Sequence, residues 1–112
     1  MEFDANKPIY VQIADNLCDR ILTGEFKPGG RIPSVREWGA QIGVNPNTVA
    51  RSYEILTDRK VIFNQRGIGF FVDGNAIDVI RESERRKFIE EELPLFRGRA
   101  ALLGINLKEF ID

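Results

Sequence analysis

Asn45-Pro46-Asn47-Thr48 has the residues of a helix start, and the residues just before it have those of a helix end. Asparagine is a favoured helix N-cap, and a proline in the first helical position lacks only an amide hydrogen that would be unpaired there. Gly43 suits the left-handed conformation that ends a helix. Two helices joined by so tight a glycine-containing turn are typical of a helix-turn-helix.

The first of these two helices is predicted to begin at Ser34-Val35-Arg36-Glu37. This is a capping box, in which the Ser34 hydroxyl accepts from the Glu37 amide and the Glu37 carboxylate accepts from the Ser34 amide. The second helix, expected over about 45–59, places Val49, Tyr53 and Leu56 on an inner stripe. The residues expected on its outer side are Asn47, Thr48, Arg51, Ser52 and Ile55.

The stretch after the second helix is typical of a β-hairpin, because residues 61–65 and 68–72 are β-branched and aromatic and Arg66-Gly67 lies between them. Arg31-Ile32, extended because Pro33 follows, is available as a third short strand. An amphipathic helix that begins after Pro8 and stops at Gly24 precedes these elements. Together they predict a winged helix over residues 1–74, with Trp38, Tyr53, Phe63 and Phe71 in its core.

Residues 75–112 return to helical spacing and form a predicted tail. Pro94 should kink or interrupt its long helix, and a short last helix starting near Asn106 should reach Asp112. So short a segment cannot enclose a core of its own, so its apolar face needs a partner, and we favour a second copy of the chain over folding back on the winged helix. The residues expected in this dimer contact are Ile89, Leu93, Phe96, Leu103 and Phe110. The predicted fold class is therefore α+β, a winged helix with an α-helical dimerisation tail.

The composition excludes several classes of function. The chain of 112 residues has no histidine and one cysteine, Cys18, so it lacks the residues for an internal disulfide, a zinc site or a common catalytic triad. We expect no enzyme activity, no cofactor and no metal. The acidic N-terminus and the absence of a long apolar run predict a cytoplasmic protein that makes no membrane contact.

The distribution of charge along the chain bears on whether it can bind nucleic acid. The formal net charge is −1, which by itself disfavours nucleic acid. Residues 31–66 nevertheless hold six cations against three acidic residues. A segment that is only weakly basic is compatible with salt-sensitive DNA binding helped by dimerisation.

Several ordered motifs resemble the GntR family of bacterial transcription regulators. The stretches that carry the resemblance are Ile9-Tyr10-Val11-Gln12-Ile13-Ala14, residues 21–29, Ile32-Pro33-Ser34-Val35-Arg36-Glu37, Gly43-Val44-Asn45-Pro46-Asn47-Thr48-Val49 and residues 65–72. The short tail resembles the YtrA subfamily, which lacks the large effector-binding domain of most relatives. The helix start is also similar to the MocR subfamily, but the chain has no room for that group's aminotransferase-like domain.

The resemblance implies a sequence-specific DNA-binding regulator. It assigns Arg36 to a phosphate or base edge, Asn45, Asn47, Thr48 and Arg51 to the major groove, and Arg66-Gly67 at the wing tip to the minor groove. Arginine suits guanine, asparagine suits adenine, and glycine lets the backbone approach the duplex closely. Many relatives carry arginine where this chain has Pro46 and Ala50, so contacts known for those positions do not transfer.

The expected partners are double-stranded DNA with a pseudo-palindromic operator and a second copy of the chain in a homodimer. The expected role is repression of a neighbouring operon, with a transporter operon as one candidate. A small-molecule effector is left open, since no residue cluster points to one. The alternative is a winged-helix protein-interaction module without specific DNA binding.

Overall fold

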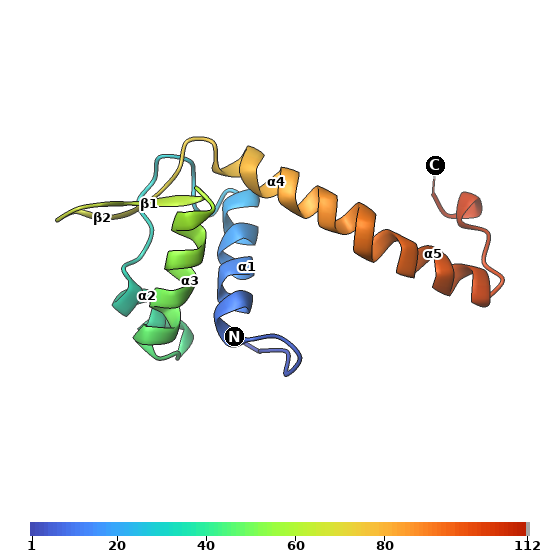
Figure 1. The fold of residues 1–112 in the computed structure, drawn as a ribbon, viewed down its shortest axis with the longest axis horizontal. Helices are drawn as coiled ribbons and strands as arrows, with labels where there is room; N and C mark the ends of the chain where they lie inside the picture. Colours follow the sequence, from blue (N-terminus) through green and yellow to red (C-terminus); the bar gives the residue numbers. More distant parts are fainter. Residues whose placement is uncertain (112) are drawn as a thin grey trace. The chain divides into compact units, whose positions relative to one another are not determined.

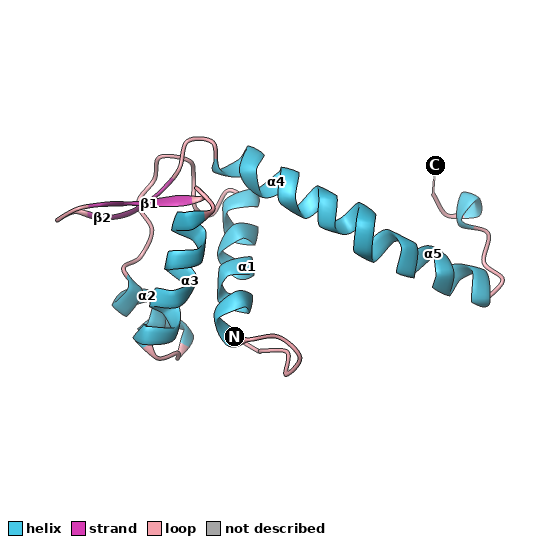
Figure 2. Cartoon of the chain, viewed as in Figure 1, coloured by secondary structure: helices cyan, strands magenta, loops and turns pink. Residues whose placement is uncertain are grey.

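The computed structural model describes residues 1–111, so the predicted end of the last helix at Asp112 lies outside the described residues. The elements in chain order are α1 (Ile9–Leu22), α2 (Val35–Ile42), α3 (Pro46–Asp58), β1 (Ile62–Gln65), β2 (Gly69–Val72), α4 (Ala76–Lys87), the π-helical η1 (Phe88–Glu92), α5 (Leu93–Leu102) and the 3-10 turn η2 (Leu107–Glu109) (Figures 1 and 2). They divide into two compact units, Met1–Ile80 and the residues from Arg81 onward.

The first unit is a winged helix, as predicted. Helices α1, α2 and α3 pack together, and the hairpin of β1 and β2 follows α3 directly (Figure 2). The largest fully buried side chains, which form the core, are Tyr53, Ile13, Leu17, Ile21, Leu56, Ile62, Ile80, Val49, Val61 and Val72. Because Ala76 and Ile80 of α4 are fully buried in this core, the first turns of α4 belong to the winged-helix unit.

The wing is a two-stranded antiparallel hairpin whose register runs from Ile62 opposite Val72 to Gln65 opposite Gly69. The expected third strand is reduced to an isolated bridge between Arg31 and Phe71, supported by a hydrogen bond from the Ile32 amide to the Phe70 carbonyl at 3.0 Å. Phe63 and Phe71 correct the sequence prediction of two core residues: Phe63 is 40% exposed, and Phe71, opposite it, is half-buried and lies outside the core. Their rings stack on one another.

The tail stays helical through Pro94, so of the expected kink or interruption the interruption does not occur. Proline lacks an amide hydrogen, and its ring clashes with the carbonyl four residues earlier, here that of Glu90. The helix accommodates this by widening into η1, where the Leu93 amide donates to the Phe88 carbonyl in the longer π pattern. Within residues 1–111, no helix is both long and apolar enough to span a membrane.

The last turn of the tail is shorter than an α-helix. After Gly104, in the left-handed conformation at φ 68°, the chain reaches η2, where the Asn106 side chain accepts from the Lys108 amide at 3.1 Å. This cap confirms Asn106 as a helix start, although only a single 3-10 turn follows it.

Tyr53 offers a test of the winged-helix packing. Its hydroxyl donates to the Pro33 carbonyl at 2.6 Å, and burial raises the pKa of Tyr53 well above its ordinary value. We expect Tyr53→Phe to lower the free energy of unfolding by about 1–2 kcal/mol in urea titrations, because the Pro33 carbonyl loses its partner. Tyr10→Phe, at the other tyrosine of the chain, is the matched control and should leave stability unchanged. Equal stability of Tyr53→Phe and wild type would contradict this reading.

Candidate nucleic-acid interface

The start of α2 is fixed by the predicted capping box. The Ser34 hydroxyl accepts from the Glu37 amide, and the Glu37 carboxylate accepts from the Ser34 amide, both at 3.1 Å. Hydrogen bonds that the Glu37 carboxylate receives from the backbone and side chain of Ser34, aided by the charge of Arg31, lower the pKa of Glu37. The box sets the direction of the helix that carries Arg36.

The turn between α2 and α3 also follows the sequence prediction. Gly43 is left-handed at φ 71°, and the Val44 amide donates to the Gly39 carbonyl at 2.9 Å. The turn runs so close to α2 that a Cβ at Gly39 would lie 2.7 Å from the Val44 carbonyl oxygen. Asn45 then caps α3 by accepting from the Asn47 amide at 2.8 Å, with Pro46 in the first helical position.

Three of the predicted site residues lie around one surface hollow. Arg36 comes from α2, and Asn45 and Asn47 come from the start of α3, with the hollow also lined by Val35, Pro46 and Ala50. Arg36, Asn45 and Asn47 are exposed. The small Ala50 side chain leaves open space between these polar groups, and the arrangement offers donors and acceptors that suit base edges and phosphates.

The other predicted residues of α3 lie outside this hollow. Thr48 is half-buried. Arg51 is exposed, and its guanidinium lies over the ring of Tyr10 in α1, 4.0 Å from the ring centroid. Ser52, expected on the outer side, is fully buried, and its hydroxyl donates to the Tyr10 carbonyl at 2.6 Å. The outer side of α3 is thus narrower than the sequence predicted.

The wing tip presents Arg66 and Gly67 to solvent. Gly67 adopts φ 80°, and the turn closes through a hydrogen bond from the Ile68 amide to the Gln65 carbonyl at 2.9 Å. A side chain other than glycine would be strained at this φ. The tip therefore combines an exposed cation with a backbone that a duplex can approach.

Sequence reasoning missed two features of this surface. A second hollow between α3 and the wing is lined by Glu54, Asp58, Asn64 and Phe70 among others. Helical spacing could have found Glu54, which follows Asn47 and Ala50 along one face of α3. In addition, the Arg31 guanidinium packs against Gly69, where an added Cβ would lie 3.0 Å from Nε of Arg31. This contact joins two sequence-distant segments, so no local pattern could have indicated it.

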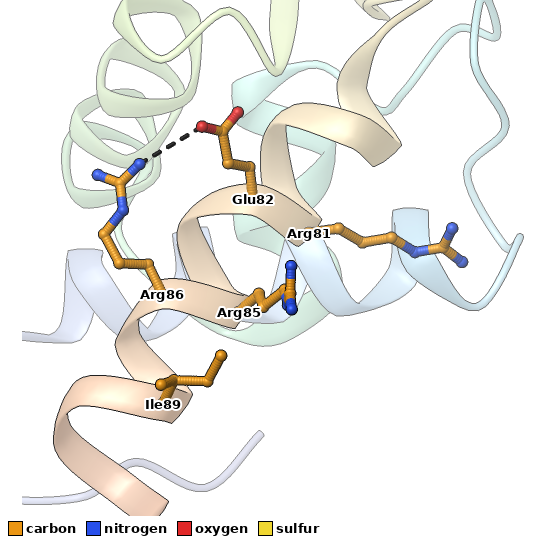
Figure 3. A pocket seen from close by; sticks show the side chains of 5 residues that line it. All are labelled: Arg81, Glu82, Arg85, Arg86 and Ile89. Carbon is orange, nitrogen blue, oxygen red and sulfur yellow. Dashed lines mark hydrogen bonds and ion pairs between the residues drawn. The ribbon is translucent and has the colours of Figure 1, made fainter.

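The second unit has a separate basic surface on α4. Arg81, Glu82, Arg85, Arg86 and Ile89 line a shallow hollow (Figure 3). Glu82 and Arg86 point toward one another and form an ion pair at 3.4 Å, whereas the Arg81 side chain extends away from them (Figure 3). An exposed pair of this spacing on one helix contributes a few tenths of a kcal/mol. This part of α4 is accordingly a solvated face.

A helix-turn-helix with polar groups around the start of its second helix, followed by a basic wing, defines the winged-helix DNA-binding transcription regulators. The chain belongs to the GntR family, since residues 9–72 match the family described as "Bacterial regulatory proteins, gntR family". The protein is accordingly a transcription regulator of this family and not an enzyme.

Three known proteins illustrate the membership. The HTH-type transcriptional repressor YtrA of Bacillus subtilis is 34% identical over 94% of this chain and 80% of its own. The solved structure of a GntR-family regulator from Bacteroides thetaiotaomicron is 48% identical, with a TM-score of 0.72 over 92% of this chain and 89% of its own. The DNA-binding domain of AraR, solved in complex with operator ORR3, is 28% identical, with a TM-score of 0.57 over 64% of this chain and 84% of its own. The resemblance to YtrA drawn from the sequence is confirmed.

The capping box yields a pH-dependent prediction. Ser34→Ala should lower the free energy of unfolding at neutral pH by about 1 kcal/mol, because the Glu37 amide loses its acceptor. The folded-state pKa of Glu37 is depressed, so its contribution to stability is present above its ordinary pKa of 4.5 and is lost as the pH falls. The stability difference between wild type and Ser34→Ala in urea titrations should therefore narrow from pH 7 to pH 3, down to the pH-independent part that comes from the lost acceptor of the Glu37 amide. A stability difference that grows on acidification would refute the assignment.

Proposed function

We propose that the protein is a homodimeric repressor that acts in the cytoplasm on a pseudo-palindromic operator of a neighbouring operon, with a transporter operon as one candidate. In this proposal α3 enters the major groove and the wing tip enters the adjacent minor groove. The observation that carries it is the gathering of Arg36, Asn45 and Asn47 around one open hollow at the start of α3. The relative YtrA is named a transcriptional repressor, and this supports repression rather than activation.

The start of α3 supplies the proposed base contacts. Asn47 can donate to and accept from adenine, and Arg36 can reach guanine or a phosphate from the flank of the hollow. The exposed first turn of α3 carries the partial positive charge of a helix N-terminus, which favours a nearby phosphate. Asn45 and Pro46 mainly begin and aim the helix, because the Asn45 side chain is engaged with the Asn47 amide.

The remaining proposed DNA contacts are of two kinds, those that depend on the base sequence and those that do not. Arg51 is proposed to read guanine from the α1 side of the recognition helix, and Thr48 to meet a phosphate or a thymine methyl group. Arg66 is proposed to enter the minor groove, where readout is less dependent on sequence, with Gly67 allowing close approach. Removing Arg51 and removing Arg66 should therefore have different consequences.

We expect Arg51→Ala to lose about 1–3 kcal/mol of binding free energy on the cognate duplex only, and Arg66→Ala to weaken all duplexes similarly. Fluorescence anisotropy measures both, using a duplex selected from a random pool by the wild-type protein, a scrambled duplex and two salt concentrations. Arg81→Ala, on α4, is the control cation and should bind as wild type. If wild type shows neither specific binding nor salt-dependent binding, the DNA proposal fails and the protein-interaction alternative replaces it.

The proposed dimer rests on the exposed apolar surface of the tail. Leu95 and Leu102 are 75% and 81% exposed, and other large apolar side chains of the tail are also exposed: Phe88, Ile89, Phe96, Leu103, Ile105, Phe110 and Ile111. Of the residues predicted for the dimer contact, only Leu93 is half-buried. Leu107 and Ile111, which follow α5, line a small hollow with Leu93 and Phe96 of that helix. Most of the apolar surface is left for a partner.

Charge complementarity favours a second copy as that partner. Glu92, Arg97 and Arg99 are exposed and make no ion pair within residues 1–111. No opposite charge lies three or four residues from any of them, so their own helix offers no partner. A second tail brings both signs together and covers the leucines. A homodimer also presents two recognition helices, which a pseudo-palindromic operator requires.

Substitutions in the tail test the dimer better than truncation, because α4 begins inside the winged-helix core. We expect Leu95→Lys combined with Leu102→Lys to give a monomer by light scattering and to weaken operator binding, since each buried leucine contributes about 1.5–3 kcal/mol to association. Thermal unfolding should remain cooperative, because both side chains are exposed in the monomer. Ile9→Lys, at an exposed isoleucine of α1, is the control and should stay dimeric. A dimer that survives the double substitution would refute the tail contact.

A further inference from the structure

The contact between Arg51 and Tyr10 joins the recognition helix to the first helix of the fold. The guanidinium carbon of Arg51 lies 4.0 Å from the centroid of the Tyr10 ring. A guanidinium over an aromatic face is attracted by the negative charge density of that face. Arg51 therefore has a fixed support although it is exposed.

A second contact fixes Tyr10 at the same place. The hydroxyl of Ser52, the residue after Arg51, donates to the Tyr10 carbonyl at 2.6 Å, and Ser52 is completely buried. Adjacent residues of α3 thus engage the side chain and the backbone of one residue of α1. The hydrogen bond sets the distance between the two helices here, and the ring then determines which way the guanidinium extends.

We infer that Tyr10 is a positioning residue for DNA recognition, because it holds Arg51 in the orientation in which Arg51 reads the operator. This inference rests on the proposed contact of Arg51 with DNA. A free arginine side chain loses rotamer freedom when it binds, and a preorganised one loses less. Stacking on Tyr10 restricts Arg51 before DNA arrives and extends the recognition surface from α3 onto α1.

The alternative is that Tyr10 is merely a packing residue of α1. In that case its loss would change stability and not the discrimination between operator and scrambled duplex. The stacking contact uses the face of the ring, so Tyr10→Phe retains it, whereas Tyr10→Leu keeps an apolar side chain without the ring. The backbone carbonyl that receives the Ser52 hydrogen bond is present in both variants.

The test is a double-mutant cycle with Tyr10→Leu, Arg51→Ala and both substitutions together, measured by anisotropy on the selected operator and on a scrambled duplex. Tyr10→Leu should weaken operator binding about three- to fivefold, with little change on the scrambled duplex. Tyr10→Phe should bind as wild type. The double variant should bind no more weakly than Arg51→Ala, because Tyr10 acts through Arg51.

The outcomes separate this inference from the function on which it rests. If Arg51→Ala binds the operator as tightly as wild type, the proposed contact of Arg51 fails. If Arg51→Ala weakens binding but Tyr10→Leu does not, or if the two losses add independently, the positioning role of Tyr10 alone is overturned. Should Tyr10→Leu fail to fold, an NMR spectrum of the wild-type protein still tests the contact between Arg51 and Tyr10. In that spectrum the side-chain protons of Arg51 should show an upfield ring-current shift. If this shift is absent, the inference is overturned.

Discussion

The buried side chain of Tyr53 fixes the positions of α2 and the wing relative to α3. Its ring is 1% exposed and meets Phe70 of the wing edge-on, with 4.9 Å between ring centroids. Its hydroxyl donates to the carbonyl of Pro33, the residue just before the cap of α2. One side chain of α3 therefore contacts both the segment that starts α2 and the strand that carries the wing. Because Tyr53 satisfies its polar group inside an apolar core, this contact also favours one specific packing.

The exposed surface of α3 follows from this buried one. With Val49, Ser52, Tyr53 and Leu56 turned inward, the start of α3 is left facing solvent beside Arg36. Asn47 then lies at the hollow, whereas Arg51 lies against α1. The small Ala50 lies between these two polar regions. The chain thus presents its own arrangement of polar groups on the winged-helix scaffold.

Local signals predicted the elements that depend on local hydrogen bonds. The capping box at Ser34, the cap at Asn45 and the turn at Gly67 each involve residues only a few positions apart, so the sequence pattern contains the whole interaction. Ser52 could not be placed in this way, because its partner Tyr10 is 42 residues away. Phe63 was misassigned because a two-stranded wing buries one face only, and residues that alternate along a strand do not reveal which face that is.

The residues of the candidate nucleic-acid interface show the same difference between features visible in the sequence and contacts that only the fold creates. The family resemblance assigns Arg36, Asn45 and Asn47 to one DNA-binding surface, whereas the packing of Arg51 on Tyr10 and of Arg31 on Gly69 is visible only in the folded chain. At Pro94 the sequence correctly marked a disturbance but not its form, because a helix can either break or widen around a proline. The widened turn keeps the tail helical and leaves its apolar side chains exposed along it.

We propose that the start of α3 and the wing tip together form the DNA-binding surface. Amide chemical-shift mapping of the isotope-labelled protein, titrated with the selected operator duplex, tests this most directly. The largest changes should fall at Arg36, at residues 45–51 and at Arg66-Gly67, with smaller changes in the tail. Changes concentrated in the tail, with the start of α3 and the wing tip unaffected, would contradict it.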